Sequence, residues 1–260
     1  MTAIATSEEI QQPRCQRENF NSLDYLQNYY TFINSEPAMN IILHLLPGLA
    51  GRLPKGCRLL DVGSGPTVYV AIIFRNAADQ IYLSDFAENN QTELQNWLAG
   101  QSQFDWTNIA KYIAQDEGKP DSWPRLQDDA RAKVRGVLGC DVTKPGVITD
   151  SQLAADKFDV VTTFFCVESA VTTVEDFQKS LKNVTDLIKS GGYFIFGGIL
   201  NESWYGTGGR KYKACPINEE ILFESLSMAG IDTKPEKCQF YMHDRYYHHE
   251  SVFLFMGKKY

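Results

Sequence analysis

The sequence has no long apolar run, no cluster of basic residues and no paired-cysteine motif. None of its apolar stretches approaches the roughly 20 residues that a helix needs to cross a bilayer. The net charge is −7, and binding to phosphates needs concentrated positive charge, so nucleic acid and membrane surfaces are poor candidates as partners. The N-terminus has no basic stretch followed by an apolar core, and we therefore expect no secretory signal.

The six cysteines are scattered through the chain without a Cys-x-x-Cys pair. Several lie in apolar, strand-like runs, which favours buried, reduced thiols in a cytoplasmic protein over a disulfide framework. The histidines His243, His248 and His249 form a group near the C-terminus. They lack a second set of ligands at zinc-like spacing, so we expect an exposed loop there and no metal site.

The most informative stretch is residues 57–69, CRLLDVGSGPTVY. It predicts a buried strand, a glycine turn over 63–65 and a helix that opens at Pro66. Such a turn lets a ligand approach the main chain at a helix N-terminus. The next strand, IYLSD, ends in Asp85, about 20 residues beyond the turn, where a carboxylate can meet a ribose. The two features together predict a cofactor that carries adenosine.

Strand and helix patterns alternate along the chain, which predicts a doubly wound α/β fold with a mostly parallel sheet. We expect strands over 57–62, 81–85, 137–142, 158–167, 193–200, 236–242 and 251–257. We expect helices over 19–33, 37–51, 68–75, 88–98, 105–114, 125–136, 174–188 and 218–228. Ligands in such folds bind at the carboxyl ends of the strands. Acidic residues stand at or just past these ends: Asp61, Asp85, Asp141, Glu168 and Glu202.

The chain reads as one domain over 19–260, after a polar leader over 1–18. The helix predicted over 19–33 is crowded with aromatic residues, and the pattern is compatible with core packing or with a lid over a ligand. We expect two insertions, a polar segment over 100–136 and a hairpin over 203–216. We find no internal repeat.

The missing third glycine of the turn restricts the choice of cofactor. A nicotinamide dinucleotide favours a third glycine, but Val68 stands at that position, which weakens close packing over a pyrophosphate. A short turn beside the carboxylate of Asp61 suits a ligand that has an ammonium and a carboxylate group. S-adenosylmethionine has both of these groups and a ribose. A dinucleotide-dependent oxidoreductase is the alternative from another class.

Several motifs resemble the family of small-molecule amine N-methyltransferases, which includes phenylethanolamine, nicotinamide and indolethylamine N-methyltransferases. They are DYLQNYY, LLDVGSGPTVY, LSDFAENNQTELQNWL, FDW, CDV, FFCVESA and GILNESWY. The resemblance extends from Phe20 almost to the C-terminus and is closest in pattern to the phenylethanolamine enzymes. It implies a Rossmann-like class I methyltransferase fold, a seven-stranded sheet, an N-terminal helical lid over 19–51 and S-adenosyl-L-methionine as cofactor.

The resemblance also implies the cofactor contacts. The lid and the turn would hold the methionine end: Tyr25, Tyr30, Gly63, Ser64, Gly65 and Tyr69. Residues after the second and third strands would meet the ribose and the adenine: Asp85, Phe86, Asn90, Asp141 and Val142. Phe164 would lie near the sulfonium. The chain departs from the family pattern at Arg17, which replaces an aromatic residue of some members, and at Phe164, which replaces a smaller one.

The acceptor end is implied by three further positions. Glu168 and Glu202 match amine-facing glutamates of the phenylethanolamine enzymes, and Tyr205 matches an aromatic residue that flanks their substrate. An aliphatic amine arrives protonated and must lose a proton before it attacks the methyl group, which a nearby carboxylate can accept. We therefore assign Glu168 and Glu202 as catalytic and substrate-binding residues, with Tyr205 beside the substrate.

Two positions disfavour nicotinamide as the acceptor. Gly198 stands where the nicotinamide enzyme has an aspartate, and Ala214 stands where it has a serine. The later acidic residue of the phenylethanolamine enzymes is not clearly present, because Tyr247 and His248 occupy that region. The sequence thus predicts a monomeric enzyme that methylates a small amine, most simply an arylalkylamine. A pyridine or other heterocyclic nitrogen is the alternative acceptor.

Overall fold

The structure is a computed structural model that describes residues 10–31, 37–149, 157–243 and 251–260. In the described part of the chain, the centre is a seven-stranded sheet of order β3-β2-β1-β4-β5-β9-β8. Its strands are β1 (Cys57–Val62), β2 (Ala78–Asp85), β3 (Val134–Gly139), β4 (Phe158–Phe164), β5 (Ile188–Leu200), β8 (Gln239–His243) and β9 (Ser251–Lys258). The first five pair in parallel, and β9 runs antiparallel to both β5 and β8. This confirms the predicted fold class.

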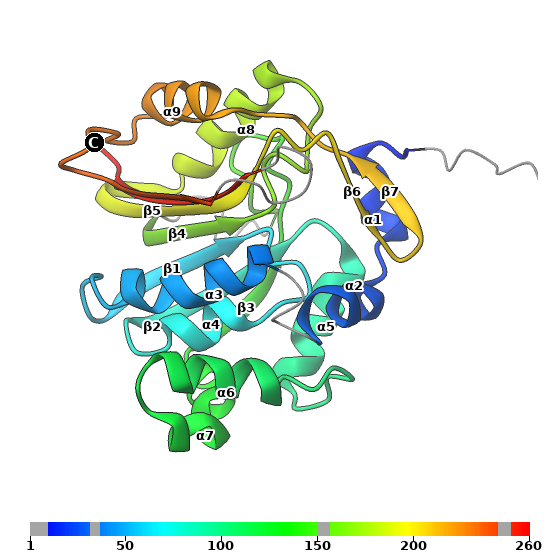
Figure 1. The fold of residues 1–260 in the computed structure, drawn as a ribbon, viewed down its shortest axis with the longest axis vertical. Coiled ribbons are helices and arrows are strands. Elements are labelled where there is room, and N and C mark those ends of the chain that lie inside the picture. The colour runs from blue at the N-terminus through cyan, green and yellow to red at the C-terminus, as the bar shows by residue number, and fades with distance from the viewer. Residues whose placement is uncertain (1–9, 32–36, 150–156, 244–250) are drawn as a thin grey trace, which may run out of the picture.

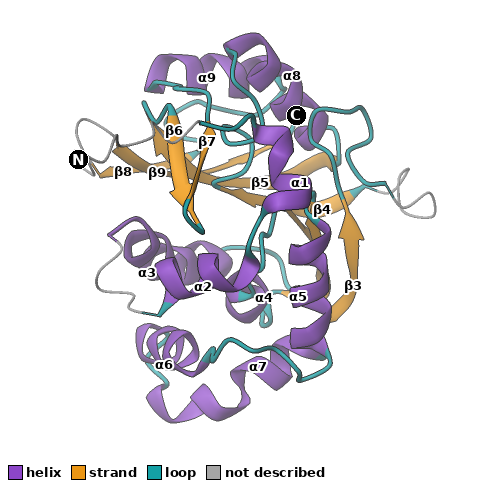
Figure 2. Ribbon diagram, turned by 90° about the vertical axis from the view of Figure 1, so that its right-hand side faces the viewer, coloured by secondary structure: helices purple, strands orange, loops and turns teal. Residues whose placement is uncertain are grey.

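Helices cover both faces of this sheet, as Figures 1 and 2 show. One face carries α3 (Pro37–Ala50), α4 (Tyr69–Phe74) and α5 (Glu88–Leu98), and the other carries α8 (Val174–Thr185) and α9 (Glu219–Met228). Because both faces are covered, the central strands carry few charges. In β4, six of the seven side chains are Phe or β-branched Val and Thr, and the seventh is Asp159. Chain order reverses between β1 and β4, and this switch point is where such folds bind ligands.

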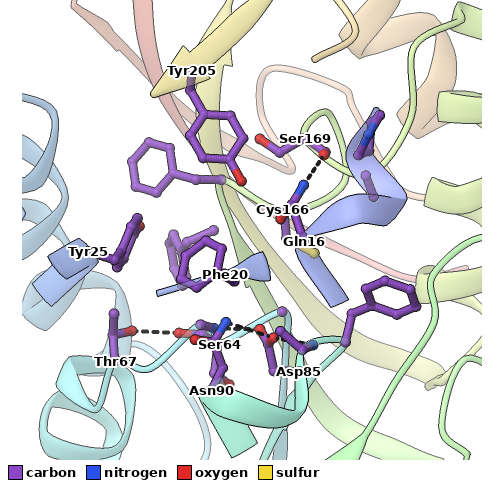
Figure 3. A pocket seen from close by; sticks show the side chains of 18 of the residues that line it. Gln16, Phe20, Tyr25, Ser64, Thr67, Asp85, Asn90, Cys166, Ser169 and Tyr205 are labelled. Atoms are coloured by element: carbon purple, nitrogen blue, oxygen red, sulfur yellow. Dashed lines mark hydrogen bonds between the residues drawn. The ribbon is translucent and has the colours of Figure 1, made fainter. Parts of the chain in front are cut away.

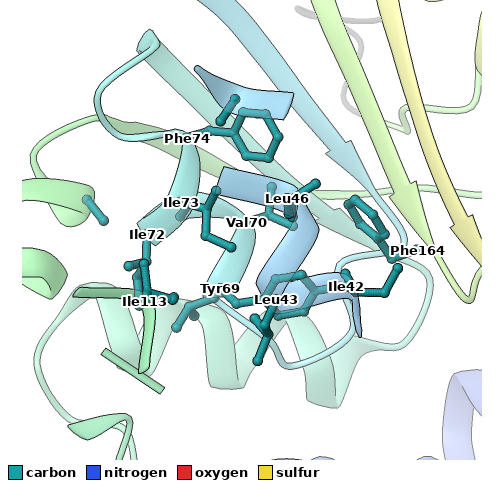
Figure 4. Close-up of a cluster of buried hydrophobic side chains, with 14 of the residues drawn as sticks. Ile42, Leu43, Leu46, Tyr69, Val70, Ile72, Ile73, Phe74, Ile113 and Phe164 are labelled. Carbon is teal, nitrogen blue, oxygen red and sulfur yellow. The ribbon is translucent and has the colours of Figure 1, made fainter. Parts of the chain in front are cut away.

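The cluster between α3 and α4 fixes the start of the site (Figure 4). All six residues of α4 are buried, and Ile42, Leu43 and Leu46 of α3 are 0% exposed. Replacing one such leucine by alanine typically costs about 2–5 kcal/mol. Since α4 begins directly after the glycine turn, this packing holds the turn in place.

The region predicted as an insertion over 100–136 contains α6 (Thr107–Asp116), a 3-10 turn η3 (Pro120–Ser122) and α7 (Trp123–Arg131). These helices pack outside α4. The guanidinium of Arg75, which is 5% exposed, donates two hydrogen bonds to the Glu117 carboxylate at 2.8 and 2.6 Å. This bidentate pair ties α6 to the end of α4.

Residues 10–18 differ from the expected polar leader. They contain a 3-10 turn η1 (Pro13–Cys15) and most of α1 (Gln16–Asn19), which precede α2 (Ser22–Tyr30). The backbone of Gln11 pairs with a hairpin made of β6 (Trp204–Thr207) and β7 (Arg210–Lys213), through hydrogen bonds to Lys211 and Lys213. Figure 1 shows α1 and α2 beside this hairpin. Main-chain pairing of this kind leaves no periodic pattern in the sequence.

Some predicted boundaries are wrong by three to five residues. The predicted helix 125–136 ends at Arg131, and the strand that follows it begins at Val134 rather than 137. Likewise α8 ends at Thr185, and β5 begins at Ile188 rather than 193. In both places a segment without an apolar pattern is part of a strand because it pairs with a parallel neighbouring strand. Val134, for example, pairs with Ile81. His248, His249 and Tyr247 lie outside the described residues.

Candidate active site

A pocket lies at the carboxyl ends of the parallel strands, beneath α2 and the β6–β7 hairpin. It brings together all but one of the residues predicted for the site. The predicted residues that line it are Tyr25, Tyr30, Gly63, Ser64, Gly65, Tyr69, Asp85, Phe86, Asn90, Asp141, Val142, Phe164, Glu202 and Tyr205. The exception is Glu168, which lies behind the wall of the pocket.

The turn after β1 requires its two glycines. Gly63 and Gly65 have φ angles of 72° and 60°, in the left-handed region that side chains disfavour. A Cβ atom on Gly63 would also lie 2.1 Å from Sγ of Cys166. The bare main chain is thus open to a ligand on the pocket side and is packed against the β4 loop behind.

Asp85 at the end of β2 is held by three donors. Its carboxylate accepts hydrogen bonds from the backbone N–H of Gly65 at 2.7 Å and of Ala87 at 2.9 Å, and from the Asn90 amide at 2.9 Å. Burial raises the pKa of Asp85, and these donors oppose that rise. A carboxylate fixed in this way can accept hydroxyl groups of a ligand in a defined geometry.

The same network reaches the lid. The Ser22 hydroxyl at the start of α2 donates to Oδ1 of the Asn90 side chain at 2.7 Å, and Nδ2 of Asn90 in turn donates to Asp85. On the other side of α2, the Tyr29 hydroxyl donates to the backbone carbonyl of Gly206 at 2.6 Å. Helix α2 is therefore tied both to the end of β2 and to the β6–β7 hairpin.

A row of aromatic rings lines one side of the pocket. Successive centroids lie 5.2 Å apart for Phe20 and Tyr25, 6.0 Å for Tyr25 and Tyr30, 5.9 Å for Tyr30 and Tyr69, and 5.9 Å for Tyr69 and Phe164. Both tyrosines of the N-terminal helix line the pocket. Tyr30 is 1% exposed and also belongs to the core, and Tyr25 faces the pocket (Figure 3). Aromatic faces also attract cations such as a sulfonium.

The acceptor end faces the turn across the pocket. Figure 3 shows the Tyr205 hydroxyl pointing into the space above Ser64 and Asp85. Two residues with side chains adopt left-handed conformations just past β4 and β5: Phe165 with φ 53° and Asn201 with φ 63°. Such backbone costs on the order of 1–3 kcal/mol and clusters at functional sites. Here the two turns precede Glu168 and Glu202.

Glu168 is 1% exposed, and its neighbours Cys166, Ser169 and Ala170 line the pocket. Burial raises the pKa of its carboxyl group to about 7, against the opposing effect of the backbone amides of Glu168 and Ile199. Its Oε2 atom has no hydrogen-bond partner among the described residues. A buried polar atom without a partner is costly, so this oxygen is available to a donor that the described residues do not supply.

Sequence reasoning missed several lining residues, among them Gln16, Cys140, Cys166, Ser169 and Ile199. Cys166 follows the apolar run of β4 directly, and that position could have indicated it. Gln16 gave no signal, because it reaches the site only through the hydrogen bond that its amide donates to the Ser169 carbonyl at 3.0 Å.

Arg17 departs from the family pattern and lies over the ring of Phe86, 5.6 Å from its centroid. It also lies 3.6 Å from Glu88, and both charged groups of that pair are well exposed. A guanidinium can cover an aromatic face much as a ring does. The contact explains how an arginine can stand where some family members carry an aromatic residue.

Comparison with known proteins decides the family. Residues 9–260 match the model of the NNMT/PNMT/TEMT family. The chain belongs to this family. It is 34% identical over 251 residues to a nicotinamide N-methyltransferase of Caenorhabditis elegans, covering 94% of this chain and 90% of that enzyme. A human nicotinamide N-methyltransferase is 30% identical over 218 residues, 82% of both chains.

A phenylethanolamine N-methyltransferase of Macaca mulatta is 33% identical over 181 residues, which are 69% of this chain and 64% of that enzyme. Among solved structures, a magnesium protoporphyrin IX methyltransferase of Synechocystis, with bound S-adenosylmethionine, superposes with a TM-score of 0.58. It covers 98% of this chain and 100% of that one at 14% identity, which supports the fold.

The chain is an S-adenosylmethionine-dependent N-methyltransferase. Its site fits this cofactor, because the bare turn, the fixed Asp85 carboxylate and the aromatic row complement an amino acid, a ribose and a sulfonium. The family assignment sets aside the dinucleotide oxidoreductase. Among the described residues, no helix is both long and apolar enough to cross a membrane, and no group of side chains is arranged to hold a metal ion.

Proposed function

We propose that the acceptor is a small primary or secondary amine, and that arylalkylamines are the preferred class. The observation that carries this proposal is the pair of carboxylates at the end of the pocket away from Asp85. Glu202 lines the pocket, and Glu168 lies directly behind its wall with an unpartnered oxygen. Two carboxylates suit an ammonium group far better than a neutral amide.

The chemistry follows from where these groups lie. S-adenosylmethionine supplies an electrophilic methyl group, so the protein must align the nitrogen, remove its proton and exclude water. Glu202 can bind the ammonium form of the acceptor. Glu168, with a pKa of about 7, can hold a proton near neutral pH and release it again, as a general base should. Tyr205 would flank the aryl group.

The cofactor contacts are part of the same proposal. Asp85 would hold the ribose hydroxyls, with Phe86 and Asn90 beside it. Tyr25, Tyr30 and the turn would hold the methionine end, Asp141 and Val142 the adenine, and Phe164 the surroundings of the sulfonium. The hydrogen bonds around Asp85 and the aromatic row support these roles.

The relatives do not choose between the two acceptor classes, because they include both nicotinamide and phenylethanolamine N-methyltransferases at similar identity. The residues favour an amine. Gly198 and Ala214 carry no polar side chain at the two positions where, by resemblance, the nicotinamide enzyme binds its amide.

A panel of acceptors tests the proposal. Methyl transfer would be measured with purified enzyme for phenethylamine, an indolethylamine, a short alkylamine and nicotinamide at the same pH. We expect the highest kcat/KM with the two arylalkylamines. A higher kcat/KM with nicotinamide than with every amine would overturn the amine assignment while leaving the methyltransferase activity intact.

We also propose that the enzyme acts as a monomer in the cytoplasm. All six cysteines are free thiols, as a reducing compartment favours. Light scattering of the purified protein and fractionation of cells that express it would test these two statements.

A further inference from the structure

Gly198 in β5 lies against the side chain of Glu168. A Cβ atom at position 198 would lie 2.3 Å from Oε1 and 3.0 Å from Cδ of Glu168, and 3.0 Å from Cε1 of Phe253. Atoms do not approach so closely without a shift. Since Phe253 is a 0%-exposed ring of the core, the carboxyl of Glu168 is the group that would have to move.

Glu168 itself has little freedom. Its backbone carbonyl accepts a hydrogen bond from Cys215 N–H at 2.8 Å, which pins the start of the side chain to the loop after the hairpin. Its carboxyl occupies the space that the missing side chain of Gly198 leaves open. The next residue in β5, Ile199, lines the pocket, and its backbone amide interacts with the Glu168 carboxyl.

Among the described residues, the titratable groups whose pKa the charge of Glu168 affects are two thiols. These thiols belong to Cys166, in the loop after β4, and to Cys215, after β7. Burial raises the pKa of each, and the charge of Glu168 raises it further. Neither thiol can neutralise a carboxylate. A cation from the acceptor is therefore the natural partner for the unpartnered Oε2 of Glu168.

We propose that Gly198 is a specificity-determining position, whose missing side chain reserves the space from which the Glu168 carboxyl serves a cationic acceptor. A side chain at 198 and a glutamate at 168 exclude each other. The strand β5 and the loop after β4 thus compete to supply a carboxylate to this end of the pocket. The role of Gly198 in specificity rests on the proposed amine acceptor. The steric conflict between a side chain at 198 and the Glu168 carboxyl does not depend on it.

The first test is a double-mutant cycle with Gly198→Ala and Glu168→Asp. Aspartate is one methylene shorter, so its carboxyl withdraws from the position that the alanine Cβ would occupy. With the best amine as substrate, we expect Gly198→Ala to raise KM about tenfold or more, as for a displaced charge-assisted hydrogen bond. In the Glu168→Asp background the same substitution should change KM by less than about twofold. Affinity for S-adenosylhomocysteine, measured by calorimetry, should stay the same throughout.

Gly257→Ala is the matched control. A Cβ atom at Gly257 would lie 2.7 Å from Cζ of Phe255, so it overpacks the same layer of the core without touching Glu168. Its effect should be equal in both backgrounds. If Gly198→Ala also raises KM equally with glutamate and with aspartate at 168, it acts through packing alone, and the proposal is wrong.

A second readout needs no acceptor. Because the pKa of Glu168 is raised, the wild-type protein should lose stability relative to Glu168→Gln as pH rises from 5 to 8. In the Gly198→Ala background, we expect the Glu168 carboxyl to leave its buried position. The difference in Tm between proteins with glutamate and with glutamine at 168 should then no longer depend on pH. An unchanged pH dependence would show that the carboxyl stays in place. If nicotinamide is preferred over every amine but the coupling between positions 198 and 168 is observed, only the amine assignment is wrong.

Discussion

The two ends of the pocket are built differently. At the proposed cofactor end, the carboxylate of Asp85 accepts hydrogen bonds from Gly65, Ala87 and Asn90, and Asn90 is held in turn by Ser22. At the acceptor end, Glu168 keeps an oxygen without a partner among the described residues. Among the described residues, the first carboxylate is held by several donors before a ligand arrives, whereas the second keeps an oxygen that can still accept one.

This difference explains how one family can keep a single methyl donor and vary the acceptor. The cofactor end is made from β1, the turn and β2, which are short-range in sequence and mutually bonded. The acceptor end is made from the loops after β4 and β5 and from the hairpin. A change there touches few of the bonds that hold the cofactor.

The largest effect should come from removing the Asp85 carboxylate. Asp85→Ala leaves the donors of Gly65, Ala87 and Asn90 without their acceptor and removes the proposed ribose contact. We expect the affinity for S-adenosylhomocysteine, measured by calorimetry, to fall more than about 100-fold. Asp128→Ala, at an exposed residue that pairs only with Arg131, serves as the control. A loss of less than tenfold in Asp85→Ala would mean that the cofactor end is not organised around this residue.

The next effect concerns proton transfer at the other end. Glu168→Gln removes a group whose pKa is about 7 and that is ionised above that pH. Turnover of an amine at pH 7.5 should fall about 10–100-fold. The pH optimum should move upward, because the reaction then relies on amine that has already lost its proton. An unshifted optimum in the pH–rate profile would argue against a role for Glu168 in deprotonation.

The same variant has a consequence for stability, with a defined sign. The unfolded carboxyl has a pKa of 4.5, and the folded one about 7, so the wild type is progressively destabilised as pH rises through this window. This pKa shift corresponds to a penalty of about 3 kcal/mol for ionising Glu168 in the folded protein. Glutamine avoids this penalty, but burying its amide offsets part of the gain in stability. Glu168→Gln should therefore raise the free energy of unfolding by about 1–2 kcal/mol at pH 8. Denaturant titrations at pH 5 and pH 8 check this, and an equal effect at both would contradict it.

The smallest effect tests the link between the lid and the cofactor end. Ser22→Ala removes the hydrogen bond to Asn90 and no other side-chain contact of the site. Such a bond contributes about 1 kcal/mol, so S-adenosylhomocysteine should bind about fivefold more weakly. Thr92→Ala, which loses only a hydrogen bond to the Glu88 carbonyl within the same helix as Asn90, should bind it normally. Equal affinity in both variants would mean that α2 does not support Asp85.

The sequence was sufficient for the parts of the molecule that rest on local chemistry. The turn over 63–65, Asp85 and the apolar run of β4 carry their own signals, since glycines, strand ends and periodicity are readable without contacts. The contribution of residues 10–18 was not readable, because Gln11 pairs with β7 through main-chain atoms. The same holds for Ser169, whose carbonyl is reached by Gln16 only in the folded chain.

Glu168 shows the limit most clearly. Its position after β4 and the family resemblance predicted an acidic group near the acceptor. Neither could show that Glu168 is buried outside the residues that line the pocket, or that its carboxyl lies against Gly198. Burial and raised pKa values come from packing between β4, β5 and β9, and no single stretch of sequence encodes that.

The separability of the two ends is tested most directly by Glu168→Gln/Glu202→Gln. Calorimetry would give the affinity for S-adenosylhomocysteine, and steady-state assays would give kcat/KM for an arylalkylamine. The account predicts an affinity within about threefold of the wild type and a kcat/KM reduced more than about 100-fold. An unchanged kcat/KM, or a parallel loss of cofactor affinity, would contradict it.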